Sequence, residues 1–188
     1  MDENSLENLL IKQQVPVQNI TEKCIVYRQI YFRNWDSEKK RKRFPAEAHF
    51  QIRNGNKGLS VNWNEHCTEQ ANFVHIGVSH NIQKSNFKNY QDFKIIRLPV
   101  SFLRGIDSGI DVIHDPEFKQ YPPLIGDPNN SAHALLTYSE EKHNDPEVLI
   151  EIVDYVGNNY DNAVFKPDLS SVDNMIDFYN NMFFNKSE

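Results

Sequence analysis

The sequence predicts an α+β fold with a mixed or antiparallel core of about six to seven strands and helices at both ends. Short runs rich in β-branched and aromatic residues, which are typical of strands, fill the chain between residues 24 and 138. Apolar residues at helical spacing lie near both termini. Strands and helices do not alternate regularly, which argues against a parallel sheet of βαβ units.

The expected strands follow from local composition and from the turn signals between them. The segment from Asn54 to Gly58 holds two glycines and two asparagines, so it predicts a turn before the next strand. The segments that we expect to be strands are Cys24–Phe32, Ala48–Arg53, Leu59–Trp63, Phe73–Val78, Phe93–Leu98, Ile110–Ile113 and Ala132–Tyr138.

The expected helices are placed by capping residues and by apolar spacing. Asp145, Pro146 and Glu147 combine a cap, a proline at the first helical position and an acid in the first turn. They predict a helix that runs to Val156 and ends at Gly157. The other segments that we expect to be helical are residues 5–12, residues 64–70 with Asn64 as cap, residues 100–104, and a last helix from Ser170 or Ser171.

The element pattern favours one domain for the 188 residues. Its parts are an N-terminal helical segment (1–20), a β-rich core (21–138) and a C-terminal helical segment (139–188). Residues 33–45 and the proline-rich residues 114–130 are expected to be loops.

Composition limits the classes of function. A net charge of −6 argues against nucleic-acid binding through bulk charge. Cys24 and Cys67 lack CxxC partners, so reduced thiols in the cytoplasm fit better than a disulfide scaffold. The acidic N-terminus does not match a signal peptide, and no apolar run approaches the ~20 residues that span a bilayer. We therefore expect a cytoplasmic protein without a membrane segment.

Three polar side chains stand inside apolar runs, where they are costly to bury unless they are paired. Arg28 follows Cys24-Ile25-Val26-Tyr27, Ser60 follows Gly58-Leu59, and His133 lies between two alanines. Arg28 offers a planar set of donors suited to phosphate or carboxylate, Ser60 a hydroxyl, and His133 a donor or base near neutral pH.

Each of these residues also has a structural interpretation. Arg28 could lie on a solvated strand face or pair with a buried acid. Ser60 could be an ordinary outward residue of an alternating strand, and no GxSxG segment marks it as a hydrolase nucleophile. His133 could be a core histidine bonded to a carbonyl.

Two further clusters of residues raise the question of a metal site or a nucleic-acid contact. His66, Cys67, His75 and His80 match no zinc-finger spacing, so we expect no metal site. The basic run of residues 39–43 could contact phosphate backbones, although acids nearby make a solvated loop the plainer interpretation.

Residues 27–29, 46–50, 58–61 and 132–135 resemble a pattern in small bacterial proteins of no settled function. The first half also resembles the RES domain of the ADP-ribosyltransferase superfamily, which binds and consumes NAD in a cleft between two small sheets. In that resemblance Arg28 is the early strand arginine, residues 59–63 form the later strand, and Glu69 or Glu65 is the acid. The glycine-rich segment is shorter here, and His133 has no counterpart.

The resemblance implies a protein that binds or cleaves NAD or a related nucleotide. The residues that we expect to be catalytic are Arg28, Ser60, His133 and Glu69, and Tyr27 and Asn62 join Arg28 and Ser60 as expected ligand-contacting residues. Arg28 would hold the pyrophosphate and Ser60 a ribose hydroxyl or phosphate. NAD is thereby the expected substrate, and no resident cofactor or metal is expected.

A second hypothesis is a protein-interaction module, such as an immunity, accessory or adaptor protein, acting through a partner or a second copy. It depends on the aromatic residues of the last helix, Phe178, Tyr179, Phe183 and Phe184, because exposed aromatic residues mark interfaces. A third is nucleic-acid binding through residues 39–43, which should depend strongly on salt.

Overall fold

The fold is α+β, as predicted. It was obtained as a computed structural model, and it describes residues 13–31, 44–53, 55–81 and 86–184. A six-stranded sheet has the order β6–β7–β2–β1–β5–β8, with every neighbouring pair antiparallel, and β3 and β4 form a separate ribbon. The helix expected over residues 5–12 and the basic run of residues 39–43 lie outside the described residues.

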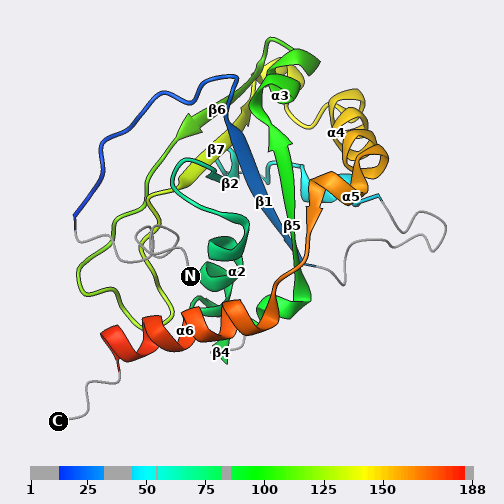
Figure 1. Ribbon diagram of the computed structural model, residues 1–188. Coiled ribbons are helices and arrows are strands. Elements are labelled where there is room, and N and C mark those ends of the chain that lie inside the picture. Colours follow the sequence, from blue (N-terminus) through cyan, green and yellow to red (C-terminus); the bar gives the residue numbers. More distant parts are fainter. Residues whose placement is uncertain (1–12, 32–43, 54, 82–85, 185–188) are drawn as a thin grey trace.

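Figure 1 shows how these elements are arranged. The strands are β1 (Ile25–Tyr31), β2 (Leu59–Trp63), β3 (His80–Asn81), β4 (Asn86–Phe87), β5 (Phe93–Pro99), β6 (Ile110–His114), β7 (His133–Tyr138) and β8 (Val164–Phe165). The α-helices are α2 (Glu69–Gly77), α3 (Val100–Ile106), α4 (Pro146–Asn158), α5 (Tyr160–Ala163) and α6 (Leu169–Phe183). Single 3₁₀ turns are η2 (Glu47–His49), η3 (Tyr90–Asp92) and η4 (Glu140–Lys142).

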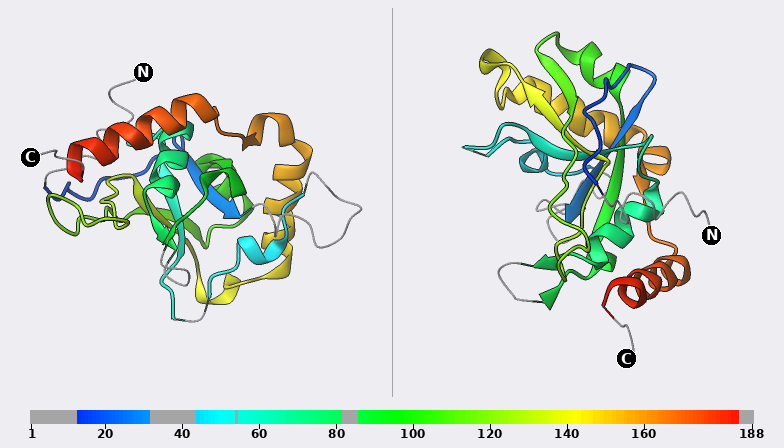
Figure 2. Two further views of the ribbon diagram at one scale, coloured as in Figure 1. Left: turned by 90° about the horizontal axis from the view of Figure 1, so that it is seen from below. Right: turned by 90° about the vertical axis from the view of Figure 1, so that its left-hand side faces the viewer.

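The two faces of the sheet pack against different helices. One face contributes alternate residues such as Val26, Val61 and Ile96 to a core with α3 and α4. The other face contributes Tyr27 and Ile95 to a second core with α2 and α6. The views in Figures 1 and 2 place α6 beside α2 and away from α4, in agreement with these two clusters. We call the first the α4 face and the second the α2 face.

Most of the predicted elements are confirmed to within a residue or two. β1, β2, β5, β6 and β7 occupy the expected segments, and α4 begins after its predicted cap, Asp145, whose carboxylate accepts from the amide of Glu147 at 2.9 Å. α6 begins one residue earlier than predicted because Asp168, rather than a serine, accepts the hydrogen bond from the amide of Ser171.

The segment Phe73–Val78 was expected to be a strand, and this prediction is wrong. It lies in α2, which begins after Thr68, whose hydroxyl accepts from the amide of Ala71. Short apolar runs are ambiguous because a helix buried on most sides has no clear polar face. Asn64 does not cap a helix: its side-chain oxygen accepts from the amide of Ile25, and residues 64–66 form a turn.

The segment Ala48–Arg53 was also expected to be a strand, and it is not one. η2 covers its first two residues, Phe50 follows as a turn, and residues 51–53 belong to no strand. The backbone of Ile52 bonds in both directions to the side-chain amide of Asn144, at 2.8 and 3.0 Å. A side chain therefore satisfies the backbone groups that a neighbouring strand would otherwise occupy.

The last segment of the chain adds one element to the sheet. After α5 the chain forms β8, which pairs with β5 at the edge of the sheet, and then enters α6. Within the described residues, none of the helices has both the length and the apolar character needed to cross a bilayer.

Candidate functional site

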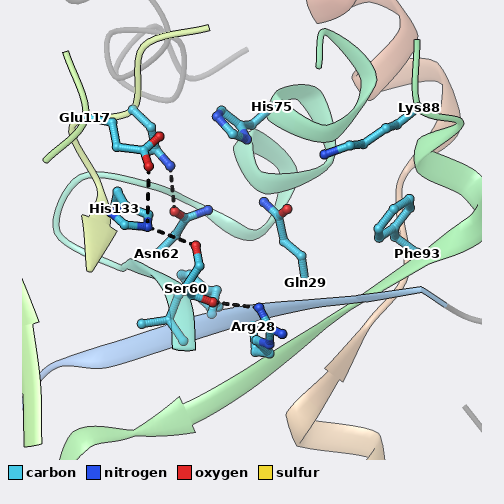
Figure 3. Close-up of a pocket in the computed structure, with 12 residues that line it drawn as sticks. Arg28, Gln29, Ser60, Asn62, His75, Lys88, Phe93, Glu117 and His133 are labelled. Carbon is cyan, nitrogen blue, oxygen red and sulfur yellow. Dashed lines mark hydrogen bonds and ion pairs between the residues drawn. The ribbon is translucent and has the colours of Figure 1, made fainter. Parts of the chain in front are cut away.

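A pocket of about 250 Å³ opens on the α2 face of the sheet. β1, β2 and β7 supply Arg28, Ser60 and His133 to its wall, α2 supplies His75, and the segment after β6 supplies Glu117. Figure 3 shows these side chains around one space. Residues more than one hundred positions apart in the chain thus share one pocket.

Ser60 and His133 form a hydrogen-bonded pair. Nδ1 of His133 lies 2.7 Å from the main-chain oxygen of Asp115, which can only accept, so Nδ1 carries the proton. Nε2 is then the acceptor in the neutral ring, and it lies 2.9 Å from Oγ of Ser60 (Figure 3). The Ser60 hydroxyl therefore donates to His133. A hydroxyl bonded to a base whose other nitrogen is fixed in this way is the arrangement of an activated nucleophile.

Two carboxylates stand beside this histidine. Asp115 Oδ2 lies 3.4 Å from Nδ1, and Glu117 Oε1 lies 3.7 Å from Nε2. Backbone bonds fix their positions, because Asp115 donates to the carbonyl of His133 and Glu117 exchanges two bonds with Asn130. The segment after β6 thus continues alongside the start of β7, and Glu117 reaches the pocket from there.

Arg28 stands where β1 and β2 separate. The strands pair at Val26–Trp63 and Tyr27–Asn62, and no further pair follows toward Arg28. By strand alternation Arg28 belongs to the α4 face. Its Nη1 donates to the carbonyl of Ser60 at 2.8 Å, and Nε and Nη2 donate to the carbonyl of His49 at 3.3 Å. The guanidinium lines this pocket and a second hollow of about 360 Å³.

Among the described residues, no carboxylate balances the charge of Arg28. Its partners there are carbonyl oxygens, and no described acid lies within ion-pair distance of it. Partial burial lowers the pKa of Arg28 to about 10, with a nearby Arg53 acting in the same direction. A half-buried cation without a counter-ion among the described residues is unfavourable, so an anion placed in the pocket would be stabilised by it.

Lys88 adds a second cation to the same pocket. Its side chain lies on the wall shared with an adjoining pocket of about 450 Å³ (Figure 3). Burial, and secondarily the charge of Lys119, lowers the pKa of Lys88. Arg28 and Lys88 therefore flank the pocket with positive charge, while Glu117 supplies a negative charge at His133.

A chain of side-chain amides forms the inner wall. Asn62 donates to Asn72 at 2.6 Å and accepts from Asn130 at 2.8 Å, and Gln29 donates to Asn72 at 3.4 Å. Asn62 was expected to contact a ligand, but its oxygen and nitrogen are both used within the protein. Its side chain thus links α2, β2 and the segment before β7. Removing one of these amide side chains would leave its buried partners unpaired, so each of them contributes to stability.

Tyr27 and Glu69 bond to each other. The phenolic hydroxyl of Tyr27 donates to Oε1 of Glu69 at 2.8 Å, and burial together with this carboxylate raises the pKa of Tyr27. Tyr27 lines the pocket, but Glu69 does not lie in its wall. Glu65, the other acid considered, accepts instead from the thiol of Cys24 at 3.5 Å. The carboxylate in the pocket is Glu117.

The structure therefore brings Arg28, Ser60 and His133, with Tyr27 and Asn62, into one wall and leaves Glu69 outside it. The sequence did not indicate Lys88 or Glu117, and it named His75 only as a possible metal ligand. Glu117 was hidden in an irregular loop, and only an extension of the β6–β7 pairing beyond His114 would have placed it opposite the start of β7.

Of the residues weighed as metal ligands, His66 and Cys67 lie apart from this pocket, whereas His75 lines it and His80 lines the adjoining pocket. His66 stacks on His114 with ring centroids 5.3 Å apart, and Cys67 is a buried free thiol, as is Cys24. Within the described ranges, no three His, Cys, Asp or Glu side chains are arranged to hold a metal ion.

No protein-family model matches the chain, and no curated protein or solved structure shows significant similarity to it.

Proposed function

We propose that this pocket binds NAD or a related nucleotide and cleaves it at the ribose. The observation that carries the proposal is an uncompensated cation, Arg28, beside a hydroxyl that already donates to a base, Ser60 to His133. The resemblance of these strands to the RES domain supports NAD as the first candidate. Positive charge for the phosphates and an activated oxygen for the ribose are the two requirements of such a reaction.

Binding of the phosphates depends on Arg28 and Lys88. A phosphate near Arg28 gains charge-assisted hydrogen bonds from N–H groups that do not face the two carbonyls. The pocket of about 250 Å³ is small for a dinucleotide, but it shares Lys88, His75 and Glu117 with the pocket of about 450 Å³. A ligand with two parts could therefore occupy both, with Lys88 between them.

The reacting groups are Ser60, His133 and Glu117. As Oγ of Ser60 bonds to C1′ of the ribose, its proton moves to Nε2 of His133. The N-glycosidic bond breaks, its electron pair neutralises the pyridinium, and nicotinamide leaves uncharged. Glu117, 3.7 Å from Nε2, stabilises the positive charge that develops on the ribose. This is the role that the resemblance assigned to Glu69.

Water completes the reaction. It attacks C1′ and loses a proton to Glu117, which passes it to solvent. Oγ leaves C1′ and recovers its proton from His133. The products are ADP-ribose, nicotinamide and one proton, and the enzyme is restored.

The test measures nicotinamide release and ADP-ribose affinity for wild type and for Lys88→Gln and Arg28→Gln. We expect each variant to bind ADP-ribose at least ~10-fold more weakly, because a charge-assisted hydrogen bond contributes about 1.5–3 kcal/mol. Lys88 has no recorded side-chain hydrogen bond among the described residues, so its variant should keep the wild-type melting temperature. Unchanged affinity and turnover in both variants would refute the proposal.

Arg104→Gln is the matched control for Arg28. Arg104 also donates to a carbonyl, that of Ile20 at 3.0 Å, and it pairs with Asp111, but it does not line the pocket. The Arg104→Gln variant should lose about as much stability as Arg28→Gln but retain nucleotide affinity. The comparison separates the loss of a backbone contact from the loss of an anion-binding charge.

A second candidate is an interaction module that uses α6. Of its four aromatic residues, Tyr179 is buried and Phe183 and Phe184 pack on the core, so the aromatic cluster is largely internal. One observation still favours this candidate: Phe178 and Met182, one turn apart, are 44% and 40% exposed. We propose this strip as the contact that a partner or a second copy would use.

A further inference from the structure

His75 is half-buried as a residue, and both of its ring nitrogens are buried. Neither of its ring nitrogens is exposed to solvent, and no described residue gives either nitrogen a hydrogen bond. The ring projects from α2 between Glu117 and Lys88 in Figure 3, on the wall that the two adjoining pockets share. The main-chain oxygen of His75 accepts from the hydroxyl of Ser79 at 2.6 Å.

Such a residue is unfavourable for the fold. Leaving a buried polar group unpaired costs about 1–3 kcal/mol, and most native proteins avoid it. A ligand that forms hydrogen bonds with the ring nitrogens would explain why a destabilising residue stands in the wall of a pocket.

The imidazole is held neutral. Burial lowers the pKa of His75 to about 3, the charges of Lys88, Lys119 and His133 act in the same direction, and Asp127 opposes them. A neutral ring has one N–H donor and one lone-pair acceptor. Its lone pair repels a phosphate oxygen, whereas a neutral group that carries both a donor and an acceptor can bond to it. The phosphates are therefore better placed at the cations.

We propose that His75 recognises the neutral amide edge of the ligand, which for NAD is the carboxamide of nicotinamide. The inference rests on the proposed function and adds the residue that distinguishes NAD from its cleaved product. The imidazole lone pair and N–H point in different directions, so the carboxamide bonds to one of them: its N–H₂ donates to the lone pair, or its carbonyl accepts from the N–H. ADP-ribose lacks this group, so His75 contributes nothing to its binding.

The experiment uses the full chain in the Ser60→Ala background, in which NAD stays intact during a titration. His75→Phe fills the site without polar atoms, and His75→Gln keeps a donor and an acceptor. Affinities for NAD and for ADP-ribose are measured by calorimetry. We expect His75→Phe to weaken NAD binding ~10-fold or more, to leave ADP-ribose affinity unchanged, and to raise the melting temperature. His75→Gln should recover part of the NAD affinity.

His114 provides the matched control. It is also buried, but Nδ1 accepts from the amide of Gln18 at 3.0 Å and Nε2 donates to the carbonyl of Ser131 at 2.7 Å. His114→Phe leaves both partners unpaired, so it should lower the melting temperature and spare the preference for NAD over ADP-ribose.

Either of two results would overturn the inference: a melting temperature that falls in His75→Phe as it does in His114→Phe, or NAD and ADP-ribose affinities that change equally. Failure of the proposed function looks different, because the protein with His75 intact would then bind neither NAD nor ADP-ribose. That result would also remove the carboxamide as the partner of His75.

Discussion

The two faces of β2 differ along the same five residues. Leu59, Val61 and Trp63 point into the apolar core of the α4 face, where each is at least nine-tenths buried. Ser60 and Asn62 point to the α2 face, where one donates to a base and the other joins an amide chain. The α4 face holds an apolar core with a hollow near Arg28, and the α2 face holds a pocket beside its own core.

The difference shows where this molecule departs from what stability alone would select. On the α4 face Leu59, Val61 and Trp63 belong to the apolar core, although Val61 also lines the pocket and Leu59 also lines the hollow of about 360 Å³. On the α2 face the chain places Lys88 and a histidine whose ring nitrogens have no described partner beside the Ser60–His133 pair. Arg28, which belongs to the α4 face by strand alternation, lines the same pocket. Unfavourable features gathered around one pocket are expected where a ligand binds.

The largest effect should come from a pair of adjacent substitutions, Leu59→Ala and Ser60→Ala. Leu59 is 6% exposed and pairs with Leu136, so its truncation should cost about 2–5 kcal/mol of unfolding free energy. Ser60 is exposed, so its truncation should change stability by less than about 0.5 kcal/mol while abolishing nicotinamide release. Denaturant unfolding and turnover measured on both variants give the comparison.

The folded fraction of Leu59→Ala should keep the wild-type turnover number, because its side chain points away from the pocket. The contrast between the faces would be lost if Ser60→Ala unfolded as readily as Leu59→Ala. It would also be lost if Ser60→Ala released nicotinamide at the wild-type rate, since the hydroxyl would then have no part in the reaction.

The α4 face was the easier one to predict from the sequence. Alternation of apolar and polar residues fixed β2 to the residue, and capping chemistry located α4. The pocket was predicted only in part: Arg28, Ser60 and His133 stood out because polar residues in apolar runs are unusual. Glu117 and Lys88 lie in irregular segments, and only tertiary contacts bring them to the site.

His75 illustrates the remaining limit. Its segment reads as a strand from composition alone, and in a strand its side chain would have no reason to meet Lys88 or Glu117. Whether a buried histidine has partners depends on contacts between distant segments, and these are not encoded in local periodicity. The amide chain of Asn62 and Asn72 was unpredictable for the same reason, because it links α2 to β2.

A smaller effect should appear as a pH dependence confined to the α2 face. The unfolded chain protonates His75 below pH 6.5, whereas the folded protein keeps it neutral down to its pKa of about 3. Stability should therefore fall as the pH drops from 6.5 toward 3. At pH 5 this one group should account for about 2 kcal/mol, from 1.36 kcal/mol per pH unit.

Urea unfolding of wild type and His75→Phe at pH 7 and pH 5 measures this contribution. Lys88, Lys119 and His133 disfavour the protonated ring, and Asp127 favours it, so these groups are left unchanged in both proteins. We expect wild type to lose about 2 kcal/mol more than the variant between the two pH values. Equal losses would mean that the ring protonates in the folded protein as readily as in the unfolded chain. His75 would then contribute nothing to the pH dependence of stability.

The smallest expected effect concerns the outer surface of α6, which belongs to neither core. Phe178 and Met182 are exposed, whereas Met175 and Tyr179 on the inner side of the same helix are buried. Deleting the whole helix would remove these buried residues, so the double substitution Phe178→Ser and Met182→Ser is the cleaner test. We expect stability to change by less than about 0.5 kcal/mol. Sedimentation velocity and nicotinamide release should also match wild type, which would confine function to the pocket. A smaller sedimenting species in the variant would instead make α6 an interface and favour the interaction module.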